Sequence, residues 1–317
     1  MTTVSVIIPT YHRPARLAAA VESALGQELP ADTALEVIVC LSDPGDVEDR
    51  RVAAALAKDS RVRVVAATAP GPAAARNAGI RAAAGEVLAF LDDDCQAQDG
   101  WLISGLANLV DADLVQGRTT PERPPGLHER SLEVEPPSWL WETCNLMVRR
   151  SMIDRAGNFD ESVHPTDDPR NHFGEDIEWG WRLVRSGARA VFAPEALVLH
   201  AVEASTRSRA LRHQLRLRNV PWLVRTVPEA RRHYIGGYFI SRHHVLVALS
   251  AGCLVSAGIA AVGGRRRTAL GIAALGIGGY LSPWRPVLTD IADRATFDAV
   301  QLAALVYGSL KWRRVIL

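Results

Sequence analysis

Three consecutive carboxylates, Asp92, Asp93 and Asp94, follow directly after the apolar run 87–91. A run of this length predicts a buried strand, and in open α/β sheets ligands bind beyond the carboxyl ends of the strands. Three adjacent acids repel one another unless a cation or a donor-rich ligand neutralises them. A cation site at this strand end is therefore one interpretation, and an acidic turn that faces solvent is the other.

Other residues that could do chemistry lie later in the chain. Glu175 and Asp176 come directly before a helix predicted over 177–186. The positive end of that helix would keep Asp176 ionised at neutral pH, and an ordinary N-cap aspartate is the alternative interpretation. His200 ends an apolar stretch over 197–200, where the pattern alone favours a strand-end histidine bonded to backbone.

These residues need a sheet to position them, and the first 94 residues predict one. Strands are expected over 4–9, 35–41, 62–66 and from Val87, with helices between them, such as the one that opens at Pro14. Short turns rich in Pro, Gly and Asp separate the elements. This alternation predicts an α/β fold with a doubly wound, mainly parallel sheet.

The next part of the chain mixes elements with two polar loops. Helices are predicted over 101–110, 150–156 and 177–186, and extended segments over 114–117, 145–148, 190–192 and 197–200. The segment 119–137 is rich in proline and charge, which is typical of a mobile loop that could cover a site, and 164–172 is expected to be another polar loop.

The charge is divided unequally along the 317 residues. Residues 1–200 carry 19 Lys and Arg against 30 Asp and Glu, whereas residues 201–317 carry 17 against 5. Such asymmetry indicates that the second part faces an anionic partner. The four cysteines (Cys40, Cys95, Cys144 and Cys253) form no CxxC pair, so we expect neither a disulfide framework nor a zinc site, in keeping with a reducing cytoplasm. We also expect no signal peptide, because the run 4–9 is too short.

The sequence of the last third of the chain predicts helices and association with a membrane. Residues 204–233 form a basic helical region, 245–262 is a run of 18 uncharged residues, and three arginines at 265–267 precede a second uncharged run over 268–282. The segment 297–310 is amphipathic. A membrane-associated hairpin, spanning or re-entrant, is one interpretation, and a buried helical hairpin is the other. The expected domains are 1–203 (catalytic), 204–244 (basic linker) and 245–317 (apolar, membrane-associating).

Seven motifs occur in the order that family 2 glycosyltransferases show. They are Val4-Ser5-Val6-Ile7-Ile8-Pro9-Thr10-Tyr11, Ala75-Arg76-Asn77-Ala78-Gly79, Asp92-Asp93-Asp94, Asn145-Leu146-Met147-Val148-Arg149-Arg150, Gly157-Asn158-Phe159-Asp160-Glu161, Gly174-Glu175-Asp176 before Trp181-Arg182-Leu183, and His200. Over about its first 200 residues the chain thus resembles these inverting enzymes, which have the GT-A fold. The resemblance implies transfer of one sugar from a nucleotide sugar to a hydroxyl acceptor.

The resemblance also implies a role for each candidate residue. Asp94, with Asp92 and His200, would hold Mn²⁺ or Mg²⁺, since hard cations take carboxylate oxygens and an imidazole suits Mn²⁺. Asp176 would be the general base, helped by Glu175. The donor nucleotide would be bound by Pro9, Thr10, Tyr11, Arg13, Asp43, Arg76, Asp92 and Asp93. The acceptor would contact Trp179, Trp181 and Arg182, although tryptophans in a helix are often core and Arg182 is equally suited to a salt bridge.

Two departures from the family pattern restrict which transfer reaction is expected. Where the family usually has two acids after the second strand, this chain has Leu41-Ser42-Asp43-Pro44, and no Gln-x-x-Arg-Trp motif of processive synthases occurs. A single addition to a lipid-linked or cell-envelope glycan, at the cytoplasmic face of the membrane and beside anionic lipids, is the leading hypothesis.

Three alternatives remain. A sugar-1-phosphate nucleotidyltransferase would need a glycine-rich first loop, and residues 10–14 contain no glycine. A non-catalytic nucleotide-binding or scaffold protein would have no need of Asp94, Asp176 and His200. Nucleic-acid binding by 204–233 is disfavoured because that region lacks interleaved aromatic residues.

Overall fold

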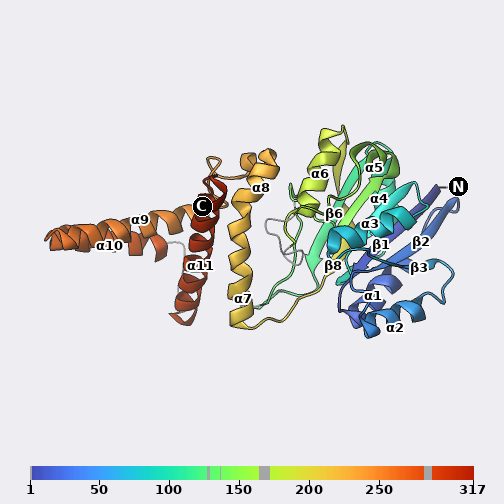
Figure 1. Cartoon of the computed structure of the whole chain (residues 1–317), viewed down its shortest axis with the longest axis horizontal. Helices are drawn as coiled ribbons and strands as arrows, with labels where there is room; N and C mark the ends of the chain where they lie inside the picture. The colour runs from blue at the N-terminus through green and yellow to red at the C-terminus, as the bar shows by residue number, and fades with distance from the viewer. Residues whose placement is uncertain (1, 127–128, 136, 164–171, 282–287) are drawn as a thin grey trace. The chain divides into compact units, whose positions relative to one another are not determined.

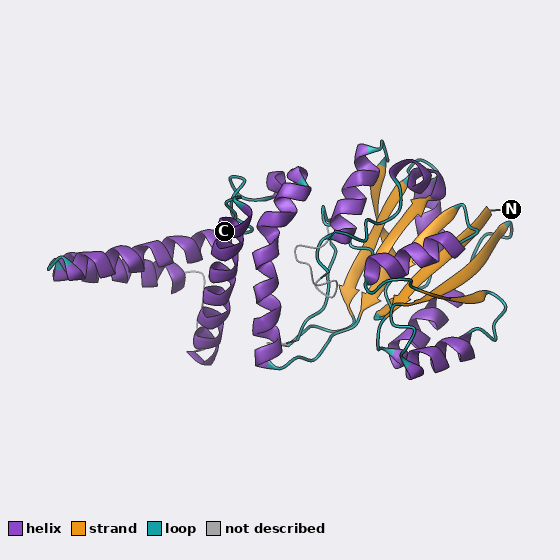
Figure 2. Cartoon of the chain, viewed as in Figure 1, coloured by secondary structure: helices purple, strands orange, loops and turns teal. Residues whose placement is uncertain are grey.

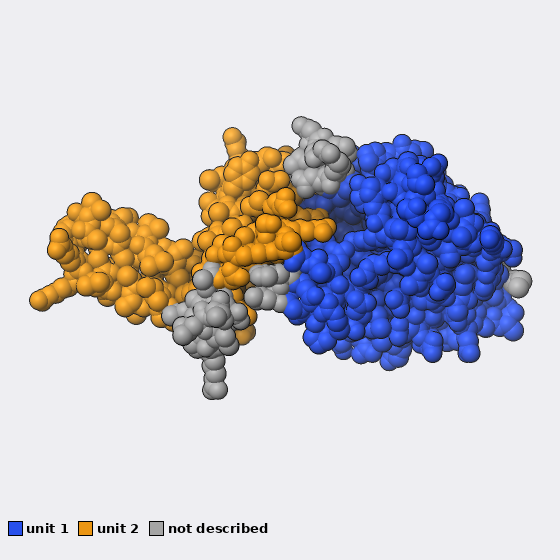
Figure 3. Space-filling model, turned by 90° about the horizontal axis from the view of Figure 1, so that it is seen from below, with its two compact units in different colours: residues 1–205 blue, residues 206–317 orange. Residues whose placement is uncertain are grey.

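The computed structural model describes residues 2–126, 129–135, 137–163, 172–281 and 288–317. The chain forms two compact units, Met1–Ser205 and Thr206–Leu317, which are described separately (Figure 3). Parts of the two predicted polar loops, at 127–128, 136 and 164–171, lie outside the described residues, as does the end of the second uncharged run at Ser282.

The first unit is built on an eight-stranded sheet in the order β3-β2-β1-β4-β7-β6-β8-β5 (Figure 1). The strands are β1 (Thr2–Thr10), β2 (Thr33–Leu41), β3 (Val62–Ala66), β4 (Val87–Leu91), β5 (Cys95–Ala97), β6 (Leu114–Pro121), β7 (Asn145–Arg149) and β8 (Ala190–His200). The helices are α1 (Pro14–Leu25), α2 (Val47–Leu56), α3 (Pro72–Ala82), α4 (Trp101–Leu109), α5 (Arg150–Ala156) and α6 (Glu175–Arg185).

The sheet is mainly parallel, as predicted. β1 pairs in parallel with both β2 and β4, whereas β7 runs antiparallel to β4 and β6. Because β1, β2 and β4 end at the same edge, the turns that follow them meet there. Those turns carry Tyr11, Asp43 and the acid cluster, so the sheet brings together residues that are far apart in the sequence.

Helices cover both faces of the sheet (Figure 2). On one face α1, α2 and α4 contribute to one core cluster that also contains alternate residues of β1, namely Val4, Val6 and Ile8. On the other face α3, α5 and α6 pack around Ile7 and Ile38. The glycine at 79 in α3 allows close packing, because a Cβ there would lie 2.5 Å from Ile7 Cγ2.

Several boundaries differ from the sequence prediction. The strand β5 was missed because it has only three residues, and it pairs antiparallel with the end of β8. β6 continues to Pro121, where a loop was expected from 119. The predicted start of α6 at 177 was wrong by two residues, which places Asp176 inside the first turn of the helix rather than at its N-cap.

The second unit is helical within its described residues. It contains α7 (Arg207–Gln214), η1 (Leu215–Asn219), α8 (Val220–Thr226), η2 (Pro228–His233), α9 (Arg242–Val262), α10 (Arg266–Leu281) and α11 (Leu288–Trp312). Asp298 of α11 accepts hydrogen bonds from His243 of α9 and Tyr280 of α10, at 2.8 and 2.7 Å. One buried carboxylate therefore links three helices.

The helices α9 and α10 pack against each other as a hairpin, with Gly276 against Cys253. Their outer sides are not covered: Val255, Ile259 and Leu275 are 64%, 69% and 74% exposed. The alternative of a buried hairpin was therefore wrong for this unit. Among the described helices, α9 alone is long and apolar enough to cross a membrane.

Candidate active site

Two arginines form ion pairs with the three acids that follow β4. Asp92 forms an ion pair with Arg76 at 2.9 Å. Asp93 and Asp94 both accept from one nitrogen of Arg13, at 3.1 and 2.8 Å. Asp93 also accepts from the backbone N–H of Tyr11 at 3.1 Å. The cluster is therefore not an acidic turn facing solvent, because Asp93 and Asp94 are buried and each carboxylate has a cationic partner.

Arg13 is fixed by the turn between β1 and α1. The buried carboxylate of Asp49 accepts the backbone N–H groups of His12 and Arg13, at 2.6 and 3.1 Å, which holds the turn in place. The other guanidinium nitrogen of Arg13 binds Glu203. Burial opposes the charge of this guanidinium, but Asp94, Asp93 and Glu203 outweigh it and raise the pKa of Arg13.

Asp94 and His200 are brought together by the pairing of β5 with β8, in which Cys95 lies opposite His200. The distance from Asp94 Oδ1 to His200 Nε2 is 3.7 Å. Nδ1 of the imidazole is 2.9 Å from the carbonyl oxygen of Ala201, which can only accept, so Nδ1 carries a proton. In the neutral ring the lone pair of Nε2 then faces the carboxylate.

Two electron-rich groups that face each other fit a cation between them. Donor atoms of Asp94, Cys95 and His200 all lie within 4.8 Å of one another. Burial and then the neighbouring Cys144 thiol raise the pKa of Cys95, so its sulfur is a neutral neighbour of the pair. A carboxylate oxygen with an imidazole nitrogen is a donor set that divalent cations such as Mn²⁺ accept.

Arg76 lies at the centre of a second cluster. The residue is only 5% exposed, and its guanidinium bridges Asp92 and Glu175, the latter at 3.5 Å. It is therefore not a surface helix arginine. Asp176 follows Glu175 in the first turn of α6, and its Oδ1 accepts the backbone N–H of Ile177 at 2.9 Å.

The pKa of Asp176 is shifted in the direction opposite to the one expected from the helix N-terminus, which was predicted to keep this residue ionised at neutral pH. Burial, followed by the neighbouring Glu175, raises the pKa of Asp176 well above its ordinary value, and Arg76 offsets this only in part. The helix N-terminus is present, but the loss of solvation outweighs its dipole. A carboxyl of this kind holds a proton more firmly than a solvated aspartate does.

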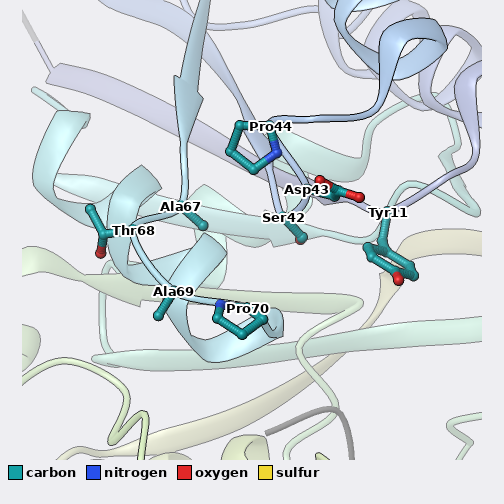
Figure 4. A pocket seen from close by; sticks show the side chains of 8 residues that line it. All are labelled: Tyr11, Ser42, Asp43, Pro44, Ala67, Thr68, Ala69 and Pro70. Carbon is teal, nitrogen blue, oxygen red and sulfur yellow. The ribbon is translucent and has the colours of Figure 1, made fainter.

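A pocket of about 340 Å³ lies beside these clusters, at the ends of β1, β2 and β3 (Figure 4). It is lined by Tyr11, Ser42, Asp43, Pro44, Ala67, Thr68, Ala69 and Pro70. Tyr11 stacks on His12, whose Nε2 is 2.9 Å from Asp43. The hydrogen bond to Asp43 raises the pKa of His12 and lowers that of Asp43.

Pro9 and Thr10 do not line this pocket. Both are buried inside β1, so the prediction that they contact the nucleotide directly is not supported by their position. Tyr11 and Asp43 do line it. Ser42 and the segment 67–70 were not predicted, because a lining made of small side chains and proline leaves no signal in the sequence.

Two of the three predicted acceptor contacts have structural roles instead. Trp179 is fully buried, stacks on Phe159 and donates to the carbonyl oxygen of Gly157 at 2.9 Å, so it belongs to the core. Arg182 forms a salt bridge with Glu178 at 2.8 Å and donates to the carbonyl oxygen of Ala156 at the end of α5. Trp181 remains partly exposed.

Sequence reasoning missed four residues that hold the site together. Asp49 and Glu203 fix Arg13, and Ser131 is hydrogen-bonded to His200. Glu142 is a buried acid that accepts from Gln116 and Ser138. Asp49 lies on a helix face and Glu203 beyond the last strand, so only the tertiary structure reveals them.

Comparison with known proteins identifies the family. Residues 5–159 match the family "Glycosyl transferase family 2". This segment, just under half of the chain, is a glycosyltransferase family 2 domain. The chain is 31% identical over 229 residues to the pre-mycofactocin glycosyltransferase of Mycobacterium tuberculosis, a match that covers 62% of this chain and 44% of that protein. Glycosyltransferase AglE of Haloferax volcanii is 28% identical over 214 residues, covering 62% and 66%. The chain thus spans less than half the length of the first of these relatives.

Solved structures of glycosyltransferases share the fold. The mannosyltransferase PcManGT from Pyrobaculum calidifontis, in complex with GDP-Man and Mn²⁺, superposes with a TM-score of 0.64 at 19% identity, covering 97% of this chain and 87% of that one. GalNAc-T7 with UDP, GalNAc and Mn²⁺ gives 0.51 at 17% identity, covering 72% and 48%. These likenesses confirm the predicted GT-A type of fold.

Proposed function

We propose that this protein is a metal-dependent inverting glycosyltransferase that moves one sugar from a nucleoside-diphosphate sugar to a hydroxyl acceptor. The observation that carries the proposal is the 3.7 Å approach of His200 Nε2 to Asp94, next to Asp92, which is bound to Arg76. Asp94 belongs to the candidate cation site, and Asp92, two residues earlier, belongs to the cluster of Arg76 and Glu175 that lies next to the candidate base Asp176. A nucleotide-binding scaffold would need neither a cation site nor a base.

Asp94 and His200 would hold the divalent cation, with Asp92 close by in the chain. When bound, the cation neutralises charge on the leaving diphosphate. Arg13 and Arg76 add positive charge at the same strand ends, and Asp93 keeps Arg13 in place at 3.1 Å. The pocket at Tyr11 and Asp43 would take the nucleoside.

Asp176 would accept the proton of the attacking hydroxyl as the bond to the anomeric carbon forms. Its raised pKa suits this task, because the ionised form of a carboxyl whose pKa is raised is a stronger base than a solvated carboxylate. Glu175 and Arg76 orient the base, and the ion pair between them, at 3.5 Å, ties the start of α6 to α3.

The second unit supports a place at the cytoplasmic face of a membrane. Arginines are frequent in 204–233, and α9 and α10 expose apolar side chains. Basic segments are attracted to anionic lipid headgroups, and exposed apolar helices gain free energy when lipid covers them. A lipid-linked or cell-envelope glycan acceptor is consistent with such a place.

A thermal-shift panel tests the function. Nucleoside diphosphates and sugar nucleotides are added with Mn²⁺, with Mg²⁺ and with EDTA, and we expect one nucleotide to raise the melting temperature in a metal-dependent way. Asp176→Asn should keep that shift and lose transfer, whereas His200→Ala should lose most of the shift. No metal-dependent shift with any nucleotide, or full turnover in Asp176→Asn, would overturn the proposal.

A further inference from the structure

The short loop before β7 carries a tryptophan in a backbone conformation that side chains seldom adopt. Trp141 has a φ of +55°, in the left-handed region where residues other than glycine are strained. Such strain persists only where the surrounding structure holds it, and it is concentrated at ligand sites.

Hydrogen bonds fix the loop on both sides of Trp141. Glu142, which follows it, is buried and accepts from Gln116 Nε2 at 2.9 Å and from Ser138 Oγ at 2.8 Å. Asn145, at the start of β7, donates to the carbonyl oxygens of Arg118 and Ala196, both at 2.8 Å. The loop is thus anchored to the sheet, and Trp141 is presented by a rigid support.

Trp141 is held against the helix that carries the candidate base. A Cβ at Gly180 would lie 2.2 Å from Cγ of Trp141, so the absence of a side chain at 180 makes room for the indole. Gly180 lies four residues after Asp176 in α6, and residues four apart share one face of a helix. The indole therefore packs one turn from Asp176, on the same side of α6.

The edge of this indole has an unused hydrogen-bond donor. Nε1 of Trp141 is shielded from solvent and has no acceptor among the described residues. The ring lies edge-to-face with Trp181, at 6.2 Å between centroids, and Trp181 donates to the carbonyl oxygen of Trp139 at 3.0 Å. A buried donor without a partner costs free energy, which an oxygen from a bound molecule would recover once a neighbouring group moves aside to open Nε1.

We infer that Trp141 is a specificity-determining residue of the acceptor site and that the acceptor it selects presents a pyranose ring. A pyranose has C–H groups on its faces and oxygens at its rim, which complements an aromatic face with a donor at its edge. Stacking on Trp141 would bring a hydroxyl of the ring to Asp176, one helical turn away. This inference rests on the proposed function, since it assigns the acceptor of the same site.

Saturation-transfer NMR tests this inference without the need for turnover. The probes are the methyl glycosides of glucose, galactose, mannose and N-acetylglucosamine, added to the full chain with UDP or GDP and Mn²⁺. At least one glycoside should bind and receive saturation at its ring C–H protons. Trp141→Phe should weaken its binding about fivefold through loss of the N–H, and Trp141→Ala at least about tenfold.

The matched control is Trp312→Ala, in the second unit, which should leave glycoside binding unchanged. Nucleotide binding by thermal shift shows that each variant is folded, and Trp141→Phe remains informative if Trp141→Ala is unstable. Where transfer to a glycoside is measurable, KM for the glycoside should rise more than kcat falls. The inference is overturned if no glycoside binds the wild type, or if both Trp141 variants bind it normally. Absence of metal-dependent nucleotide binding would instead overturn the proposed function.

Discussion

Removal of the buried guanidinium of Arg76 should both destabilise the protein and shift its activity to higher pH. The side chain lies between Asp92 at 2.9 Å and Glu175 at 3.5 Å, and it is 5% exposed. In Arg76→Met the carbon chain is kept, but these acids lose their cation. Removing one partner of a buried ion pair costs about 3–5 kcal/mol, because the remaining charge loses its partner and is only partly solvated.

The change in pH dependence has a definite sign. Arg76 lowers the pKa of Asp176 and opposes burial and Glu175, which raise it. Without Arg76 the pKa of Asp176 rises further, so the base becomes available only at higher pH. The acidic limb of kcat/KM, which reports the free enzyme, should therefore move to higher pH.

Urea unfolding measures the loss of stability. A pH–rate profile measures the shift of the acidic limb, with the sugar-nucleotide donor that the thermal-shift panel selects. Arg81→Met is the matched control, since Arg81 lies on the same helix and is exposed, and it should cost less than about 1 kcal/mol. A loss below about 1 kcal/mol in Arg76→Met, or a limb that stays in place or moves to lower pH, would refute this account of the cluster.

Three further predictions concern other parts of the chain. Burial raises the pKa of Glu142, so the folded state keeps this proton after the unfolded state has lost it, and the contribution of Glu142 to stability falls as pH rises. Urea unfolding at about pH 4 and pH 7 should show that Glu142→Gln reduces this fall. Gly180→Ala should cost about 1–3 kcal/mol by overpacking against Trp141, whereas Gly278→Ala, which meets nothing within 4 Å, should not destabilise the protein in a thermal melt. Ile259→Asp, at a 69% exposed position, should weaken flotation with anionic vesicles and leave stability within about 0.5 kcal/mol.

Much of the fold could be predicted from the sequence because its strands are apolar and its turns carry proline or glycine. β3 was predicted to the residue, and the strand before the acid cluster was recognised from its sudden end. The antiparallel β7 was predicted as extended, but its direction depends on which neighbours it pairs with. Local sequence contains no information on that choice.

The site was harder to predict because its contacts join distant parts of the chain. Arg13 and Glu203 are 190 positions apart, and they meet only after β8 has paired with β6 and β5. The two tryptophans of α6 show the same limit. Trp179 shares a helix face with Leu183 and is buried against Phe159, whereas Trp181, two positions away, lies toward Trp141.

The raised pKa of Asp176 is a further property that no local pattern shows. A helix N-terminus lowers the pKa of an acid, and this is the effect that the sequence predicts. Burial and a second acid act in the opposite direction, and their size depends on packing around α6. The helix start is therefore a weaker guide to ionisation than the solvation of the carboxyl.

The charges at the strand ends lead to a last prediction, on the order of binding. Asp92, Asp93 and Asp94 share two arginines with Glu175 and Glu203, so carboxylates outnumber these guanidinium groups. A nucleoside diphosphate adds further negative charge, which the cluster repels unless a cation has entered first. We therefore expect Mn²⁺ to bind without nucleotide, and UDP or GDP to bind at least about tenfold more tightly with Mn²⁺ than in EDTA, as measured by calorimetry. Tight nucleotide binding in EDTA would show instead that Arg13 and Arg76 leave their acids for the diphosphate, and that the cation is not what balances this site.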